Sequence, residues 1–490
     1  MKESNELFQE ITEGNTKLLV PKKSLTEKTP PIKPAFFNPK AKTNRDFSII
    51  AYAAFLKKFE GPKIFLEALS GVGARGLRVV NELKIEKMII NDLNPTALQM
   101  AKHSANLNNL KSIEFSEKEA CVFLSEHSRK EKRGSLVDID PFGSPAAFFN
   151  PKARTNRDFS MIAYAAFLKK FEGPKIFLEG LSGVGARGLR VANELKIEKM
   201  IINDLNPTAL QMAKHSANLN NVKNIEFSEK EVCVFLSEHS RKEKRGSLVD
   251  IDPFGSPATF FDCGIRATMH GGMLSTAATD LQVLNGLFQG ACKRKYGGIP
   301  VRVEYGNEMA IRLILGSLRS VAARLGIEII PMFVESEMHY YRTYVKILNR
   351  IDQEENIGYI IHCKNCGHRK ISLKQQQECE LCKLKTSIAG PLWIGKIFDK
   401  EYVKNMIEEI PNLKINKSCE KTLYKCLDES EMPGTYFTLD EIAKKNKSSP
   451  PKLEKIILNL KEKGFVSSVT SFNPTGFRTN ANINEIINNF

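Results

Sequence analysis

The sequence predicts an α/β fold, in which a doubly wound and mostly parallel β-sheet carries helices on both faces. Short apolar runs alternate with segments whose apolar residues recur at helical spacing, as in strand–helix–strand units. The first apolar run, residues 63–69, passes into the glycine-rich turn 70–76, and the next run ends at the acidic Asp92. Because ligands of such sheets bind beyond the carboxyl ends of the strands, we expect the functional site at that edge.

This strand–helix block occurs twice in tandem. Residues 35–146 are repeated as residues 147–258 with seven mild substitutions. A solenoid repeat is typically about 20–50 residues long and drifts in sequence, whereas this unit is longer and nearly unchanged. We therefore interpret the repeat as a duplicated gene segment. The seven differing pairs are Lys42/Arg154, Ile49/Met161, Ala68/Gly180, Val80/Ala192, Leu110/Val222, Ser112/Asn224 and Ala120/Val232.

Each element of the block follows from a local pattern. In the first copy the strand at 63–69 breaks at the glycines, after which Leu77, Val80 and Leu83 fall on one face of a helix. The last strand of the block stops at Pro141. The expected elements are a hairpin over Leu7–Pro21 around Glu13-Gly14-Asn15, strands at 63–69, 87–90, 112–115 and 135–140, and helices after the glycine turn and over Thr96–Asn106.

The glycine turn and the acid at the next strand tip predict a nucleotide-like cofactor. Gly71 and Gly73, with Gly183 and Gly185 in the second copy, let the backbone approach a ligand closely. An acid at the following strand end, Asp92 or Asp204, can hydrogen-bond the two hydroxyls of a ribose. The spacing of these features fits NAD as well as S-adenosylmethionine, so it does not separate the two cofactors.

The fourth strand carries the more specific signal. It ends in Asp140-Pro141-Phe142-Gly143, repeated as Asp252-Pro253-Phe254-Gly255. This resembles the Asp/Asn-Pro-Pro-aromatic signature of methyltransferases that modify exocyclic amino groups on bases. A carboxylate and a backbone carbonyl that accept the two N–H bonds of the amine would turn its lone pair toward the methyl group, while the aromatic ring stacks on the base. The alternative is an ordinary Asp-Pro turn that ends a strand.

Taken together, these motifs make the chain similar to the tRNA (guanine-26, N2)-dimethyltransferase family of archaea and eukaryotes over nearly its whole length. The resemblance implies a Rossmann-like class I methyltransferase fold, S-adenosylmethionine as methyl donor, and mono- and dimethylation of a guanine N2 in tRNA. The matching segments are Phe-Phe-Asn-Pro through Asn44-Arg45-Asp46, Leu-Ser-Gly-Val-Gly-Ala-Arg-Gly-Leu-Arg, Asn91-Asp92, Asp-Ile-Asp-Pro-Phe-Gly-Ser-Pro, Thr276-Ala277-Ala278-Thr279-Asp280 and Asn473-Pro474-Thr475-Gly476.

The same resemblance implies roles for individual residues in both copies. The implied catalytic carboxylate is Asp140 or Asp252, and in the second copy Pro253 and Phe254 complete the motif. The implied cofactor contacts are Arg45/Arg157, Arg78/Arg190, Asp92/Asp204, Glu119/Glu231 and the residue after it, Ala120/Val232.

The duplication departs from the family, whose pattern contains this segment once. A methyltransferase sheet needs roughly seven strands, and the later ones occur once, beginning at residues 272–276 after the second copy. Short connections favour pairing of those strands with the second copy. Against this, the hairpin Leu7–Pro21 is joined directly to the first copy. A first copy with four strands would have an unpaired edge, so we expect a monomer or a domain-swapped dimer.

Four of the ten cysteines have metal-ligand spacing. Cys363 and Cys366 form one Cys-x-x-Cys pair, and Cys379 and Cys382 form another a dozen residues later. Two such knuckles suit one tetrahedral Zn²⁺ held by four thiolates, in a structural role. The other six are expected to be core or surface thiols: Cys121, Cys233, Cys263, Cys292, Cys419 and Cys426.

The C-terminal segment favours nucleic-acid binding. Thr438 begins a helix with an N-cap, the periodic Leu453–Leu460 predicts a second helix, and Gly464 ends it, which is the pattern of a winged helix. Phe472, Phe477 and Arg478 would stack on or clamp RNA, or the two phenylalanines would instead belong to the core. Four lysines supply phosphate contacts: Lys452, Lys455, Lys461 and Lys463.

Composition fits this interpretation. The 490 residues are 42% hydrophobic, enough for several cores, and 72 Lys+Arg against 56 Asp+Glu give a formal charge of +16, which favours a polyanionic partner. No apolar run is long enough for a membrane span and the N-terminus is too polar for a secretion signal, so we expect a cytoplasmic protein.

The sequence therefore predicts a zinc-containing, S-adenosylmethionine-dependent tRNA methyltransferase. The alternative is a non-catalytic tRNA-binding protein whose methyltransferase fold is compromised by the duplication. A DNA amino-methyltransferase is disfavoured because its motif has a second proline where Phe142 and Phe254 stand. The expected division is 1–34 hairpin segment, 35–146 first copy, 147–345 complete methyltransferase domain, 346–396 zinc-ribbon-like segment, and 397–490 winged-helix-like RNA-binding domain.

Overall fold

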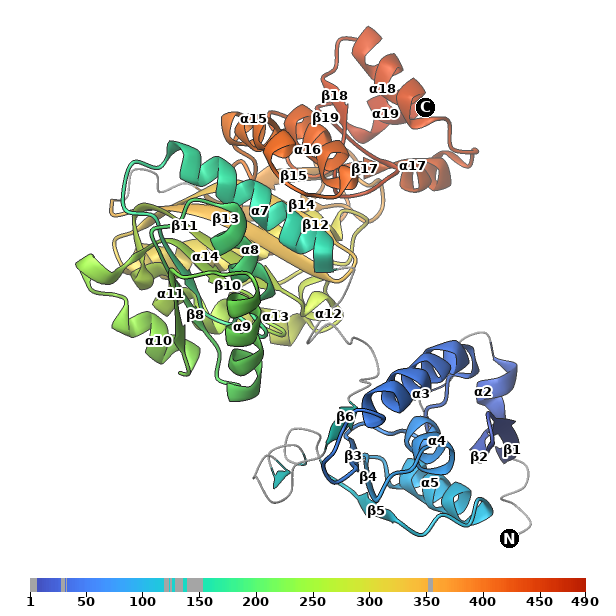
Figure 1. Cartoon of the computed structure of the whole chain (residues 1–490). Coiled ribbons are helices and arrows are strands. Elements are labelled where there is room, and N and C mark those ends of the chain that lie inside the picture. The colour runs from blue at the N-terminus through green and yellow to red at the C-terminus, as the bar shows by residue number, and fades with distance from the viewer. Residues whose placement is uncertain are drawn as a thin grey trace. The chain divides into compact units, whose positions relative to one another are not determined.

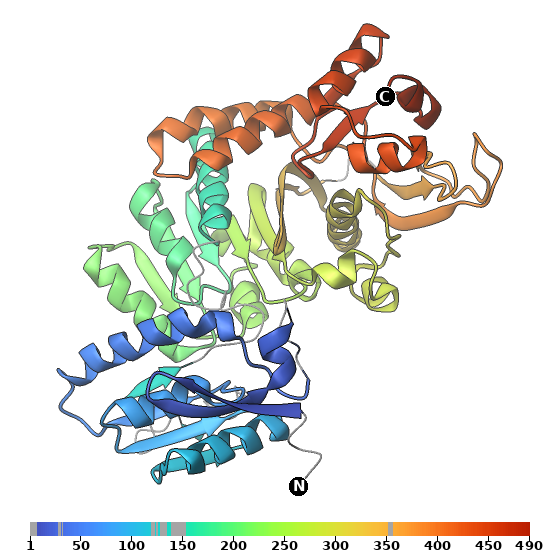
Figure 2. The same ribbon diagram turned by 90° about the vertical axis from the view of Figure 1, so that its right-hand side faces the viewer.

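A computed structural model describes residues 7–27, 31, 33–118, 123, 126–127, 135–138, 153–350 and 356–490. The chain forms two compact units, Met1–Phe149 and Asn150–Phe490, so one copy of the repeat lies in each (Figures 1 and 2). Each unit is described by itself.

The first unit contains a four-stranded parallel sheet in the order β5-β4-β3-β6. The four strands predicted for the first copy are confirmed, each to within a few residues. The elements are α3 (Lys42–Leu56), β3 (Ile64–Glu67), α4 (Ala74–Glu82), β4 (Lys87–Asn91), α5 (Pro95–Leu107), β5 (Ile113–Ser116) and β6 (Leu136–Asp138).

The predicted N-terminal hairpin is also confirmed, and it packs on the first copy. Strands β1 (Phe8–Glu13) and β2 (Thr16–Pro21) pair antiparallel, and the short helix α2 (Lys22–Thr26) follows. Strand β2 contacts α4 and α5, with Leu18 and Val20 buried in the core of this unit.

The second unit contains a seven-stranded sheet in the order β12-β13-β11-β10-β7-β8-β9. All neighbours are parallel except the pairs that involve β13, which runs antiparallel to both β11 and β12. The strands that occur once in the sequence therefore complete the sheet of the second copy. The strands are β7 (Ile176–Glu179), β8 (Lys199–Asn203), β9 (Ile225–Ser228), β10 (Gly246–Ile251), β11 (Thr268–Ala278), β12 (Glu328–Glu337) and β13 (Tyr340–Leu348).

One large apolar core extends from the sheet of the second unit to helices α15 and α16, and the last three helices form a separate, smaller core. Helix α14 packs on β12 and β13, and α15 packs on α7. The helices are α7 (Ala153–Lys170), α8 (Ala186–Glu194), α9 (Pro207–Leu219), α10 (Val232–Glu238), α11 (Phe261–Ala267), α12 (Leu281–Leu284), α13 (Gln289–Tyr296), α14 (Gly306–Arg324), α15 (Lys400–Glu409) and α16 (Lys417–Glu429).

The segment that carries the cysteine pairs is a three-stranded antiparallel sheet in the order β15-β14-β16. Its strands are β14 (Ile357–His362), β15 (Arg369–Ser372) and β16 (Ser387–Trp393). Strand β16 lies against α14, so this ribbon shares the core of the methyltransferase-like sheet.

The C-terminal segment has the predicted helix–turn–helix–wing layout. The Thr438 side chain accepts a hydrogen bond from Glu441 N and so caps α17. Phe472 and Phe477 are buried, so the structure supports the core alternative for the two phenylalanines. The Arg478 guanidinium pairs with Glu308 and Glu429. The elements are β17 (Phe437–Thr438), α17 (Leu439–Asn446), α18 (Leu453–Glu462), β18 (Ser467–Val469), β19 (Gly476–Thr479) and α19 (Ile483–Asn488).

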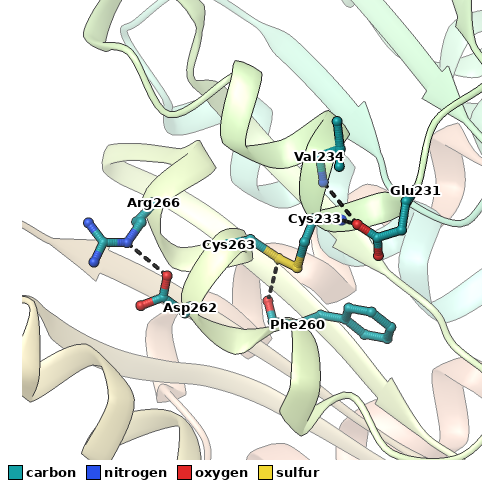
Figure 3. The surroundings of a disulfide bond; sticks show 7 residues. All are labelled: Glu231, Cys233, Val234, Phe260, Asp262, Cys263 and Arg266. Carbon is teal, nitrogen blue, oxygen red and sulfur yellow. Dashed lines mark hydrogen bonds and ion pairs between the residues drawn. A yellow bond between two sulfur atoms is a disulfide. The ribbon is translucent and has the colours of Figure 1, made fainter.

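One prediction about the remaining cysteines is wrong. Cys233 on α10 and Cys263 on α11 form a disulfide (Figure 3), whereas the sequence predicted two separate thiols. The two positions are 30 residues apart without any motif, and only the packing of α10 on α11 brings their Cα atoms within 5.5 Å. Among the described helices, none is long and apolar enough to cross a membrane.

Candidate active site

The predicted glycine turn and strand-tip acid of the second copy meet at the carboxyl edge of the sheet. Gly183 and Gly185, between β7 and α8, have φ values of +53° and +73°, a region that glycine adopts at little cost. Asp204, after β8, accepts a hydrogen bond from Gly183 N at 2.6 Å and another from Asn206 N at 2.9 Å. The carboxylate therefore fixes the shape of the turn at the place where a nucleotide-like ligand is expected.

The Asp252-Pro253-Phe254-Gly255 loop follows β10 at the same edge. Gly255 N donates to Thr279 Oγ1 at 2.6 Å, and Thr279 N donates to Gly255 O at 2.8 Å, so the loop is held by the residues after β11. Phe254 is 78% exposed. Such an aromatic ring on a fixed loop is available to stack on a base.

Two buried arginines hold the Asp252 carboxylate. Arg187 from α8 donates to Asp252 Oδ2 at 2.6 Å, and Arg342 from β13 donates to the same oxygen at 3.2 Å. Both arginines donate to Oδ2 and neither to Oδ1, and the side chain is 27% exposed. Oδ1 is therefore the oxygen that can accept a hydrogen bond from a ligand.

The same two arginines hold a second, deeper carboxylate, Asp250. Arg187 and Arg342 both pair with it, and Tyr164 OH donates to it at 2.9 Å. Burial opposes ionisation, but the two guanidinium charges lower the pKa of Asp250 to about 2. Sequence reasoning missed Arg187, Asp250 and Arg342. For Arg342, the sequence does carry a signal: it is a single arginine within the tyrosine-rich run Tyr340-Tyr341-Arg342-Thr343-Tyr344.

A further buried acid lies at the end of β7. Glu179 is 2% exposed, and burial raises the pKa of this carboxyl to about 8. The nearby charges of Asp250 and Asp252 raise the pKa further, while Arg187 opposes them. The sequence pattern, a glutamate ending an apolar strand, had indicated nothing about this residue.

Arg157 and Arg190, the predicted cofactor arginines, lie on α7 and α8. Arg190 pairs with Asp158 at 2.7 Å and with Glu194 at 2.6 Å. Burial, followed by the positive charges of Arg187 and Arg190, lowers the pKa of Arg157. Three arginines thus lie close together here, and Arg190 among them is already paired with two carboxylates.

The structure gives Glu231 and Val232 local structural contacts. The Glu231 side chain caps α10 by accepting hydrogen bonds from Cys233 N at 2.8 Å and Val234 N at 3.0 Å (Figure 3). Val232 is buried beside Gly180, where a Cβ atom would lie 2.9 Å from Val232 Cγ2. The absence of a side chain at Gly180 therefore leaves room for Val232. The first copy has alanine at both corresponding positions, Ala68 and Ala120.

The first copy repeats part of this geometry. Asp92 accepts from Gly71 N at 2.7 Å, and Arg75 pairs with Asp138, the counterpart of Asp250. Arg45 and Arg78 differ from their counterparts because both pair with Glu13 of the hairpin. Three predicted site residues of this copy lie outside the described residues: Glu119, Ala120 and Asp140.

The four predicted metal ligands form one cluster. The sulfur atoms of Cys363, Cys366, Cys379 and Cys382 all lie within 4.8 Å of one another. Backbone hydrogen bonds shape the two knuckles, with Cys363 N donating to His368 O and Cys379 N donating to Leu384 O, each at 2.8 Å. Four convergent sulfurs are the donor set of a structural tetrahedral Zn²⁺ site.

Comparison with known proteins supports the resemblance inferred from the motifs. Residues 14–150, and again residues 146–490, match the family described as N2,N2-dimethylguanosine tRNA methyltransferase. A tRNA (guanine(26)-N(2))-dimethyltransferase of Methanosphaera stadtmanae is 33% identical over 69% of this chain and 89% of its own length. A protein of the same name from Methanobrevibacter smithii is 34% identical over 71% of this chain and 92% of its own length.

A solved structure gives the same result. Trm1 from Pyrococcus horikoshii, in complex with S-adenosyl-L-methionine, matches with a TM-score of 0.63 and 28% identity over 72% of this chain and 96% of that one. The chain belongs to the N2,N2-dimethylguanosine tRNA methyltransferase family and contains part of the family's pattern twice.

Proposed function

We propose that this protein is an S-adenosylmethionine-dependent tRNA methyltransferase that mono- and dimethylates the exocyclic N2 of a guanine, at position 26, and that the second copy contains its active site. One observation carries the proposal. The Asp252–Gly255 loop, the glycine turn and Asp204 lie together at the carboxyl edge of the seven-stranded sheet of that copy.

In this proposal the glycine turn would hold the cofactor, with Asp204 accepting hydrogen bonds from the ribose hydroxyls and Gly183 and Gly185 letting the backbone approach the ligand. Arg157 and Arg190 would supply positive charge for the carboxylate of the cofactor, and Glu231 with Val232 would border its base. When bound, the cofactor would supply the methyl group: the bond from carbon to the guanine N2 would form as the bond from carbon to sulfur breaks, the sulfur would leave as a thioether, and the N2 proton would leave toward Asp252 Oδ1.

Asp252 and Phe254 act on the guanine. Phe254 stacks on the base, and Asp252 Oδ1 accepts a hydrogen bond from the N2 amino group, so the nitrogen lone pair turns toward the methyl group. Pro253 limits the backbone freedom of the loop between them. Arg187 and Arg342 hold the other oxygen, so Asp252 positions the amine without moving.

The rest of the second unit supports tRNA binding. Cys363, Cys366, Cys379 and Cys382 would hold Zn²⁺, which stabilises the ribbon and takes no part in the chemistry. Lys452, Lys455, Lys461 and Lys463 are exposed on and beside α18 and supply phosphate contacts. We further propose that the protein works in the cytoplasm, on tRNA, with the five-part division of the chain set out above.

The direct test is methyl transfer from labelled S-adenosylmethionine to unmodified tRNA, followed by nucleoside analysis. The intact chain should form N2-methylguanosine and N2,N2-dimethylguanosine, and Asp252→Ala should lower the rate by about 10²–10³ if orientation supplies a few kcal/mol of the barrier. Phe254→Ala should lower the rate less than Asp252→Ala does, because stacking contributes about 1–3 kcal/mol per base.

Filter binding of tRNA serves as the control for this test. Asp252→Ala should bind tRNA as the intact chain does, since the target base is the one part of the tRNA that Asp252 is proposed to contact. An intact chain that binds tRNA and forms no methylated guanosine would instead identify a non-catalytic tRNA-binding protein.

A further inference from the structure

The first copy binds the N-terminal hairpin through a defined set of side chains. The Asn108 amide accepts from Lys17 N at 2.9 Å and donates to Lys17 O at 2.7 Å. Ser104 Oγ accepts from Leu19 N at 2.8 Å, and Asn81 Nδ2 donates to Asn15 O at 2.8 Å. Strand β2 thus binds α4 and α5 with its own backbone, which makes the contact specific to an extended segment.

The second copy carries the same side chains without a hairpin on them. Asn193, Ser216 and Asn220 occupy the positions that correspond to Asn81, Ser104 and Asn108. Met100 is 3% exposed beneath the hairpin, whereas its counterpart Met212 is 53% exposed. Leu219 on the same helix is 70% exposed. An apolar surface of this kind, bordered by preserved polar ligands, marks an interaction site.

A hollow beside these side chains enlarges the surface. It has a volume of about 350 Å³ and is lined by Asn193 and Asn220 together with Ala192 and Val222. The last two are smaller than Val80 and Leu110 of the first copy, so the substitutions leave the hairpin contacts intact and add room.

We propose that this surface, called here the second-copy face and made of Asn193, Met212, Ser216, Leu219 and Asn220, binds the β1–β2 hairpin of a second copy of the chain. The Asn220 amide then pairs with both backbone groups of Lys17, and Ser216 accepts from Leu19 N. In the first copy Glu13 pairs with Arg45 and Arg78, whereas in the second copy Arg190 already pairs with Asp158 and Glu194, so the proposed contact depends on the backbone of β2.

The occupant that we propose is the hairpin of a second chain, and the isotope readout below separates it from the chain's own hairpin. In the first copy, the connection that follows the hairpin is anchored on the same unit. Ser24 and Ala35 are buried there, and Asn94 Nδ2 donates to Pro34 O at 2.9 Å. Reciprocal exchange of the hairpin between two chains replaces contacts by nearly identical ones, which is the low-cost route to a swapped dimer.

The test traps the exchanged hairpin in the full chain and does not depend on methyl transfer. Lys17→Cys combined with Asn220→Cys is treated with a short bis-maleimide in an equal mixture of ¹⁵N-labelled and unlabelled protein. Lys17→Cys combined with Asn108→Cys is the matched control, which reports the hairpin on the first copy. Mass spectrometry then identifies the linked peptides and whether the two partners carry different isotopes.

The proposal predicts linked peptides containing positions 17 and 220 with mixed isotopes, in a covalent dimer whose yield rises with protein concentration. Links between 17 and 220 with unmixed isotopes only, or none while the control pair links, would overturn it.

Discussion

Helices α3 and α7 have almost the same sequence and almost opposite surroundings. Phe47 on α3 is 68% exposed and its counterpart Phe159 on α7 is 1% exposed, and Ile50 and Ile162 differ in the same way, at 65% and 0%. Helix α7 packs against α15 and α16, which follow the second copy only. Burial of a repeated segment is therefore decided by what comes after it in the chain, and local sequence does not distinguish the two outcomes.

The hairpin shows the opposite case. It precedes the first copy in the chain, and it covers the first copy and not the second. The first copy has a covered glycine-turn helix and an unfinished sheet, whereas the second has a finished sheet and an uncovered α9. Arg342, which comes from β13, joins Asp250 to Asp252 in the second copy. Completion of the charge network thus depends on a residue far along the chain.

The largest difference between the copies should appear in a pair of aromatic truncations. Phe159→Ala removes a buried ring and should lower the free energy of unfolding by about 3–5 kcal/mol. Phe47→Ala removes an exposed ring and should change it by less than about 0.5 kcal/mol. Urea denaturation of the two variants measures both values, and similar losses would show that α3 is covered in solution as α7 is.

A smaller effect should follow from Gly180. Gly180→Ala places a Cβ atom 2.9 Å from Val232 Cγ2 and should cost about 1–3 kcal/mol by overpacking. Adding Val232→Ala recreates the Ala/Ala pair of the first copy and should recover most of the loss. Thermal unfolding of the single and double variants would reveal this coupling, and additive losses would argue against it.

The pKa of Glu179 predicts a pH dependence that Glu179→Gln should reduce. An acid whose pKa is about 8 in the folded state and about 4.5 when unfolded binds more protons when folded, so stability is present at low pH and decreases as pH rises through that window. The slope from this group is at most about 1.4 kcal/mol per pH unit. Denaturation of both proteins between pH 5 and 8 measures it, and parallel pH profiles would refute the assignment.

The smallest expected effect is a difference in stability between Ser104→Ala in the first copy and Ser216→Ala in the second copy. Ser104→Ala removes the acceptor of Leu19 N and should destabilise the first unit by about 1 kcal/mol. Ser216→Ala should have little effect on a dilute monomer, because no hairpin covers it. Hydrogen exchange of the β2 amides should report the first change, and an equal response to Ser216→Ala at low concentration would contradict the assignment of the hairpin to the first copy.

Local patterns were enough to predict the strands, the glycine turn with Asp204, the Cys-x-x-Cys cluster and the hairpin. Each depends on residues close in sequence or on a spacing that chemistry restricts. Arg342, Glu179 and the Cys233–Cys263 disulfide were missed, because each gains its role from contacts made by the packing of distant segments. The duplicated block shows this limit directly, since one sequence pattern leads to two different environments.

We propose that only the second copy is a working active site, and a comparison of Asp252→Ala with Asp140→Ala in the methyl transfer assay tests this. Both substitutions remove the same carboxylate from the same motif, so each is the control for the other. We predict that Asp252→Ala loses methylated guanosine while Asp140→Ala keeps the rate of the intact chain. Loss of product with Asp140→Ala alone would contradict this account and assign the active site to the first copy.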